Sequence, residues 1–87
     1  MLTPDTILMI HGDDTVARIR CAGSYTHNLF NYLRRENTDY VVACTDYGGV
    51  LWVADGMSEQ VWEPESTNPE ETRKETLDRF PELAGKW

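Results

Sequence analysis

The residues best suited to chemistry near the N-terminus are His11, Asp13 and Asp14 in the segment HGDD. A histidine and a carboxylate that are close in a loop can ligate a divalent metal or form an acid–base pair. The segment is also typical of a turn, because glycine tolerates positive φ and aspartate bonds to its own backbone. We favour an exposed turn, and keep a small enzyme or metal-dependent module using these residues as the alternative function.

A second possible pair is His27 with Cys21, but a Cys–His pair needs a third group to orient the base, and the sequence supplies none. We therefore expect His27 to have a capping or surface role. A closed zinc site would need His11, Cys21, His27 and Cys44 together, and their spacing matches no familiar zinc motif. No phosphate-binding glycine loop or hydrolase motif is present, so we predict no catalytic residue, metal or cofactor. Cys21 and Cys44 are expected to be reduced and buried, with a cross-strand disulfide as the alternative.

Charge distribution is the sharpest signal in the sequence. From Asp55 to Glu71 the chain carries six carboxylates and no Lys or Arg, a net charge of −6 in 17 residues. Residues 1–54 carry six acids and four bases, a net charge of only −2. Such a run is either a solvated face or a strip that docks on a basic groove, where it would compete with nucleic acid and accelerate association.

Two aromatic residues accompany this acidic run. Trp62 lies within it, and Tyr47 is expected at the tip of a hairpin, where burial in a core is least natural. Aromatic side chains are the usual anchors of protein interfaces. We therefore predict a partner-binding surface made of Tyr47, Asp55, Glu59, Trp62, Glu63, Glu65, Glu70 and Glu71.

Length and composition restrict the class of protein. The 87 residues, of which 40% are hydrophobic, fit a single domain over 1–87 with a core too small to enclose a deep cavity. A net charge of −7 disfavours direct binding to nucleic acid or an anionic membrane. Residues 1–10 lack the basic start of a signal peptide and no apolar run is long enough to span a bilayer, so a cytoplasmic protein is expected.

The pattern of residues along the chain predicts that these side chains are held by an α+β domain with ββαββ order. Residues 6–10 and 15–22 form one hairpin, because Ala17, Ile19 and Cys21 alternate with polar positions. Ser24 is a suitable N-cap for a helix over 24–36. Strands at 40–45 and 50–54 form the second hairpin, and residues 57–62 are a short fifth strand or an irregular stretch.

A second helix should follow the acidic linker. Asn68 is its expected N-cap and Pro69 its first residue, with the helix ending near Arg79. We therefore predict an antiparallel sheet of four or five strands, one helix packed across it and a C-terminal helix over about 69–80. The first helix should share a single core with the sheet, comprising Ala17, Ile19, Leu29, Phe30, Leu33, Val41 or Val42, Leu51 and Val53.

These features identify no family, but they favour a non-catalytic interaction protein: a small acidic module that binds and inhibits or modulates a larger protein with a Lys/Arg-rich groove. Many inhibitors of host defence from phages and mobile elements, anti-CRISPR proteins and nucleic-acid mimics among them, are small, acidic and without motifs, so such an inhibitor is one expectation. An antitoxin or immunity protein would act by the same mechanism.

Overall fold

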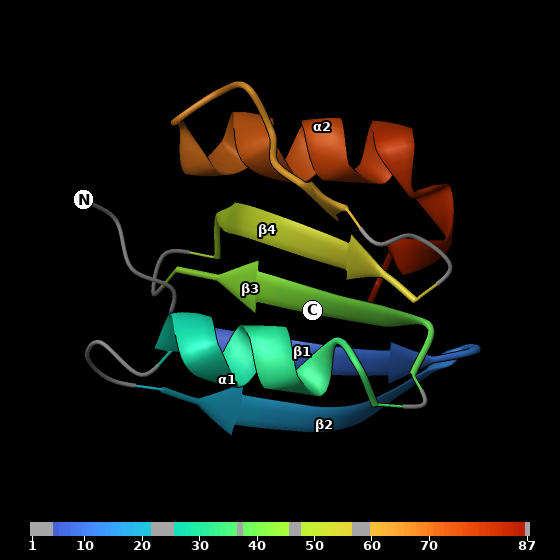
Figure 1. Ribbon diagram of the computed structural model, residues 1–87. Coiled ribbons are helices and arrows are strands. Elements are labelled where there is room, and N and C mark those ends of the chain that lie inside the picture. The colour runs from blue at the N-terminus through green and yellow to red at the C-terminus, as the bar shows by residue number, and fades with distance from the viewer. Residues whose placement is uncertain (1–4, 22–25, 37, 46–47, 57–59, 87) are drawn as a thin grey trace.

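The architecture is that of a computed structural model, which describes residues 5–21, 26–36, 38–45, 48–56 and 60–86. Within these ranges a five-stranded antiparallel sheet has the order β2-β1-β3-β4-β5, with two α-helices and a short 3-10 helix η1 (Figure 1). The predicted α+β fold is confirmed, with the fifth strand present. The elements are β1 (Thr6–His11), β2 (Asp14–Arg20), α1 (Thr26–Leu33), β3 (Tyr40–Cys44), β4 (Val50–Asp55), β5 (Val61–Trp62), α2 (Pro69–Arg79) and η1 (Pro81–Leu83).

The first hairpin joins β1 and β2 through a tight turn. His11 lies opposite Asp14, and Gly12 between them has a φ of 59°. That conformation is open to glycine at little steric cost, which explains why HGDD forms a turn here. The chain then crosses to the other edge of β1, so that β1 pairs with both β2 and β3.

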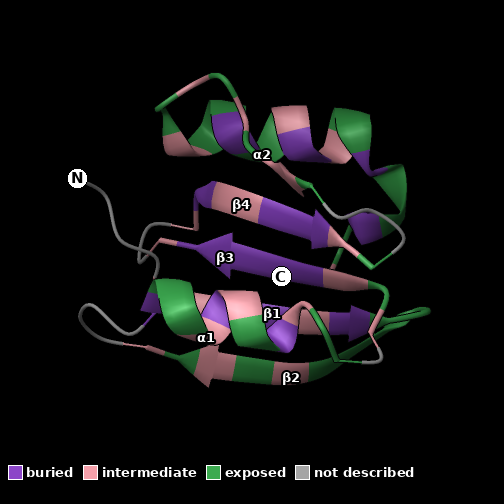
Figure 2. Cartoon of the chain, in the orientation of Figure 1, coloured by how far each residue is buried: buried purple, intermediate pink, exposed green. Residues whose placement is uncertain are grey.

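The sheet is buried on both faces, so the single core that we expected from the sequence is wrong. Val41 and Val42 are both buried, and they belong to different hydrophobic clusters because neighbouring residues of a strand point to opposite faces. Figure 2 shows β3 buried along most of its length, whereas β2 at the edge of the sheet is largely exposed. The apolar run of β3 is therefore typical of a strand with both faces covered.

Helix α1 covers the first of these faces. Phe30 and Leu33 are buried there against Ile7, Val41 and Ala43, and Leu29 is half-buried beside them. The helix ends at Leu33, before the predicted end at 36, and the predicted start with its cap Ser24 lies outside the described residues. Ile19 and Cys21 of the first hairpin, which were predicted to share one face of their strand, pack against the same cluster.

The second face is covered from the C-terminal side. Phe80 and Leu83 are buried in a cluster with strand residues that include Val53, and Leu77 packs against it. As predicted, Asn68 caps α2: its side-chain oxygen accepts from the backbone N–H groups of Glu70 and Glu71 at 3.0 and 3.3 Å. Among the described residues, this cluster has eight buried members and the cluster beneath α1 has six.

Leu51 does not occupy the buried position that the sequence suggested. Ala43 pairs with Trp52 and Cys44 pairs with Val50, so Leu51 is the extra residue of a β-bulge. It is half-buried and belongs to neither cluster. A bulge interrupts the alternation from which the core position was predicted.

Candidate functional site

A surface groove of about 270 Å³ lies between β4, the connector that precedes α2, and the first turn of α2. We call it the β4 groove, and its main lining residues are Leu51, Trp52, Glu63, Pro64, Glu65 and Pro69. Apolar residues, among them Leu51, Trp52 and Pro64, contribute to the lining, and Glu63 and Glu65 are exposed. The groove therefore combines an apolar lining with two carboxylates.

Hydrogen bonds hold the connector that forms one wall of the groove. The two carboxylate oxygens of Glu75 accept from the backbone N–H groups of Glu65 and Ser66, each at 3.0 Å. The Ser66 hydroxyl donates to Glu71 at 2.7 Å and accepts from the N–H of Asn68 at 3.1 Å. The carboxylates of Glu71 and Glu75 thus fix the connector to α2.

A buried threonine joins the opposite wall to α2. The Thr72 hydroxyl accepts from the backbone N–H of Val50 at 3.0 Å and donates to the carbonyl of Pro69 at 2.7 Å. Thr72 is 4% exposed and Val50 is 1% exposed. The start of β4 and the first turn of α2 are thus held at a fixed separation, and the groove lies between them.

Trp52 connects the groove to the face covered by α1. Its ring lies 5.4 Å from that of Phe30 and meets the exposed His27 edge-on at 5.1 Å, as measured between ring centroids. His27 therefore has a surface packing role in the structure. Since the indole is held from this side, Trp52 offers a preformed apolar surface to the groove.

The structure separates the residues of the predicted partner-binding surface. Glu63 and Glu65 line the β4 groove, and Glu70 and Glu71 lie exposed in the first turn of α2 next to it. Asp55 instead lies at the other end of β4. Trp62 is half-buried on the second face and packs edge-on against Phe80 at 5.5 Å. Tyr47 and Glu59 lie outside the described residues.

Asp55 belongs to an acidic depression of about 530 Å³ near the turn of the first hairpin, which it lines with Asp13, Glu36, Asp39 and Glu82. The Asp39 carboxylate accepts from the N–H of Gly12 at 2.7 Å and lies 3.7 Å from Nδ1 of His11. Here Tyr40 donates a hydrogen bond to Glu82; burial first, and then this bond, raise the pKa of Tyr40 well above its ordinary value. The same bond lowers the pKa of Glu82.

The residues of the alternative enzymatic function do not form a metal site in the part of the chain that the structure describes, where no group of three His, Cys, Asp or Glu side chains is arranged to hold an ion. Asp13 lies beside Lys86, whose ammonium is 3.9 Å from its carboxylate, whereas His11 lies beside Asp39. Asp13 and His11 thus have different neighbours.

Cys21 and Cys44 are free thiols that pack on opposite faces of the sheet. Burial raises the pKa of Cys44 to about 12, and burial together with the nearby Asp5 raises the pKa of Cys21. Because the thiolate is the nucleophile, neither side chain is activated for covalent chemistry at neutral pH.

Sequence reasoning missed the contributions of Leu51, Pro64 and Glu75 to this site. Leu51 was assigned to the core, and Glu75 has no distinguishing sequence signal because its role is to bond a connector ten residues away. Pro64 lies in the acidic linker, and no role was assigned to it from the sequence.

Comparisons with family models, with curated proteins and with solved structures find no match for this chain. None of the helices in the described ranges has the length and apolar character that crossing a bilayer requires.

Proposed function

We propose that this protein is a non-catalytic interaction protein that binds a larger protein through the β4 groove. The observation that carries the proposal is the juxtaposition of an apolar lining, made by Leu51, Trp52 and Pro64, with the exposed carboxylates of Glu63 and Glu65. Apolar pockets with a few charged groups at the edge are the usual form of sites that hold one anchoring side chain of a partner.

The chemistry of the groove fits an arginine or lysine side chain. The aliphatic part of such a side chain can lie against Trp52 and Pro64, while its charged end reaches the carboxylates of Glu63 or Glu65. An arginine is favoured over a lysine, because its planar guanidinium binds a carboxylate through two parallel hydrogen bonds and stacks on an aromatic ring. The partner is therefore expected to present a Lys/Arg-rich surface.

The charge around the groove supports the same choice of partner. Between Glu63 and Glu71 the chain has four carboxylates and no Lys or Arg. Clustered charge of one sign steers an oppositely charged partner and raises its association rate. A partner whose basic surface ordinarily binds nucleic acid would be blocked by this contact, so inhibition is the expected consequence. The analogy with small acidic inhibitors from phages and mobile elements rests on size and charge.

The test is a comparison of captured proteins by mass spectrometry between wild-type protein and two matched variants. The double reversal Glu63→Lys and Glu65→Lys changes the groove, and it leaves the connector in place because Glu65 is held there through its backbone N–H. The control, Glu36→Lys with Asp78→Lys, makes the same change in net charge at exposed positions outside the β4 groove.

Proteins retained by the wild type and by the control, and lost with the groove variant, are the expected result. With such a partner in hand, the groove variant should associate several-fold more slowly at low salt and show a weaker salt dependence. If the groove variant retains the same proteins as the wild type, the β4 groove is a solvated surface and the proposal is wrong.

A further inference from the structure

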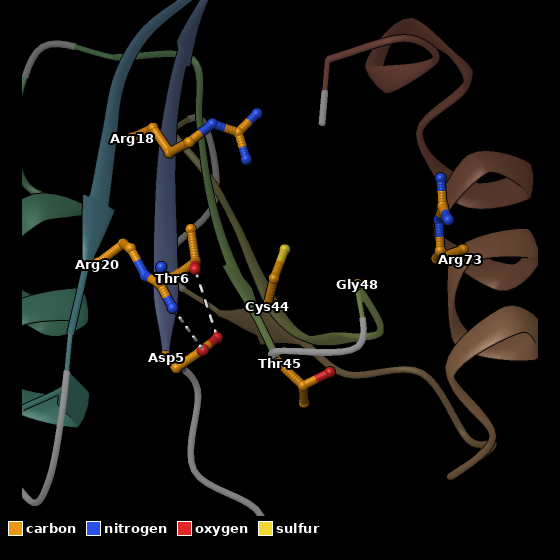
Figure 3. Close-up of a pocket in the computed structure, with 8 residues that line it drawn as sticks. All are labelled: Asp5, Thr6, Arg18, Arg20, Cys44, Thr45, Gly48 and Arg73. Atoms are coloured by element: carbon orange, nitrogen blue, oxygen red, sulfur yellow. Dashed lines mark hydrogen bonds and ion pairs between the residues drawn. The ribbon is translucent and has the colours of Figure 1, made fainter.

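A second pocket, of about 450 Å³, lies on the face of the sheet opposite α1, where α2 and the sheet diverge. Figure 3 shows its residues coming from four elements and a turn: Arg18 and Arg20 from β2, Thr6 from the start of β1, Cys44 from β3 and Arg73 from α2. Arg18 extends toward the open space between the sheet and α2, the Cys44 thiol points into it, and Arg73 stands on its far side. We call this space the arginine pocket.

The described lining of this pocket is rich in arginine, although the protein as a whole is acidic. The whole chain has a net charge of −7, yet three of its eight Lys and Arg residues line this pocket. Asp5 is the acid among the described lining residues, and it lies 4.0 Å from Arg20 while accepting a hydrogen bond from the Thr6 hydroxyl at 3.4 Å. Among the described lining residues, arginines therefore outnumber acidic residues by three to one.

This arrangement is not explained by packing. Arg18, Arg20 and Arg73 are all exposed, so their guanidinium groups are not required to fill the core. Arg18 and Arg73 both act to lower the pKa of the buried Cys44 thiol, which places their positive potential at the floor of the pocket, although burial is the larger effect there.

The donors suit a phosphate group in particular. Arginine binds phosphate oxygens through two parallel charge-assisted hydrogen bonds, and three arginines line this pocket. The volume lies in the range of about 300–1,000 Å³ that is usual for small-molecule sites, which leaves room for more than a bare phosphate. We propose that the arginine pocket binds the phosphate group of a small phosphorylated molecule.

The experiment is a titration of the ¹⁵N-labelled full chain, followed by amide and arginine side-chain NMR signals. The probes are inorganic phosphate, adenosine monophosphate, adenosine and a single-stranded oligonucleotide. Phosphate and the monophosphate should both shift the signals of Arg18, Arg73 and Thr6 in a saturable way, and adenosine should not. A tighter response to adenosine monophosphate than to phosphate would show that the ligand is a phosphorylated molecule, and equal responses would indicate free phosphate.

Matched variants separate a pocket from a general charge effect. Arg18→Gln and Arg73→Gln should each weaken phosphate binding about 10-fold or more, because each removes a charge-assisted hydrogen-bond donor. Arg35→Gln makes the same charge change at an exposed residue just after α1 and should leave binding unchanged. Arg18→Lys and Arg73→Lys retain charge and test whether the paired donors of arginine are needed. Circular dichroism verifies the fold of each variant.

Three outcomes would overturn the proposal: no saturable response to phosphate at millimolar concentration, an equal loss in Arg35→Gln, or an oligonucleotide that binds more tightly than the monophosphate through the same residues. The last result would assign the pocket to nucleic acid. Because the capture experiment on the β4 groove leaves these arginines intact, either proposal can fail without the other.

Discussion

Replacing Thr72 with valine isolates the single hydrogen bond that joins the two walls of the β4 groove. Valine has nearly the same shape as threonine but cannot accept the bond from the backbone N–H of Val50. That N–H belongs to a residue only 1% exposed, so water cannot easily replace the lost acceptor. An orphaned buried donor costs about 1–3 kcal/mol of stability. For a domain of this size, each kcal/mol lowers Tm by roughly 4–8 °C.

Thr76 provides the matched control on the same helix. It is fully buried at 0% exposure, and its hydroxyl donates to the carbonyl of Thr72 at 2.7 Å. Thr76→Val removes a donor, and the group left behind is the carbonyl of Thr72, not an N–H. That carbonyl still accepts a hydrogen bond within the helix, so no buried polar group is left unpaired. Its loss should be about 1 kcal/mol or less, partly offset by burying a methyl in place of a hydroxyl.

Urea unfolding followed by tryptophan fluorescence measures both variants, since Trp52 and Trp62 lie on opposite sides of the core. Thr72→Val should lower the free energy of unfolding by more than Thr76→Val does, and Thr72→Ser, which keeps the hydroxyl, should recover part of the difference. If Thr72→Val and Thr76→Val are equally stable, the bond between Thr72 and Val50 does not hold the groove together and our description of its walls is incorrect.

Two further predictions concern titratable groups. A carboxyl whose pKa is lowered in the folded state contributes stability above its unfolded pKa, and this is lost as the pH falls through the folded value. Glu82 should behave in this way. Tyr40→Phe removes the hydrogen bond that lowers the pKa of Glu82, so the variant should show a smaller fall in Tm than the wild type as the pH drops below about 4.3. Identical profiles of Tm against pH for the two proteins would count against that bond. Burial keeps the Cys44 thiol protonated, so iodoacetamide at about pH 8 should alkylate the half-exposed Cys21 first, and both at similar rates in urea. Peptide mass spectrometry measures the order, and faster labelling of Cys44 in the native protein would contradict it.

Local sequence signals predicted the elements of this fold well. The cap at Asn68, the turn at Gly12 and the apolar strand around Val41 each depend on residues that are close in sequence. Their physical causes, an acceptor for orphan N–H groups and the conformational freedom of glycine, act within a few residues. This is why the element boundaries at the C-terminal helix match the prediction to within a residue.

Features that depend on the pairing of distant elements could not be predicted in this way. The bulge at Leu51 arises from the register between β3 and β4, and no residue type marks it. Thr72 and Thr76 can be buried because their hydroxyls donate hydrogen bonds to carbonyl groups of α2. From the sequence alone, a threonine is expected to lie at the surface. The sequence predicted a single core, and buried threonines on α2 gave no sign of a second one.

The acidic run shows the same limit for function. Asp55 and Glu63 belong to one run in the sequence, but Asp55 lies at the end of β4 near Asp39 and Glu82, whereas Glu63 lines the β4 groove. Net charge per segment could be read from the sequence, but its separation into two acidic regions depends on the topology. Only the Glu63–Glu71 part adjoins an apolar groove, and this is the part on which the proposed function depends.

The two proposed sites share a structural element, the turn that follows β3. Thr45 lines both the β4 groove and the arginine pocket, and a side chain at Gly48 would come within 3.9 Å of the guanidinium of Arg73. Glu70 and Glu71, which lie next to the β4 groove, and Arg73, which lines the arginine pocket, are close together in the sequence of α2. An anion in the arginine pocket would neutralise positive charge close to the groove, and the attraction between the groove and a cationic partner would rise because Coulomb energies add. If both proposals hold, the ligand and the partner bind at adjoining sites on one surface, next to the shared turn.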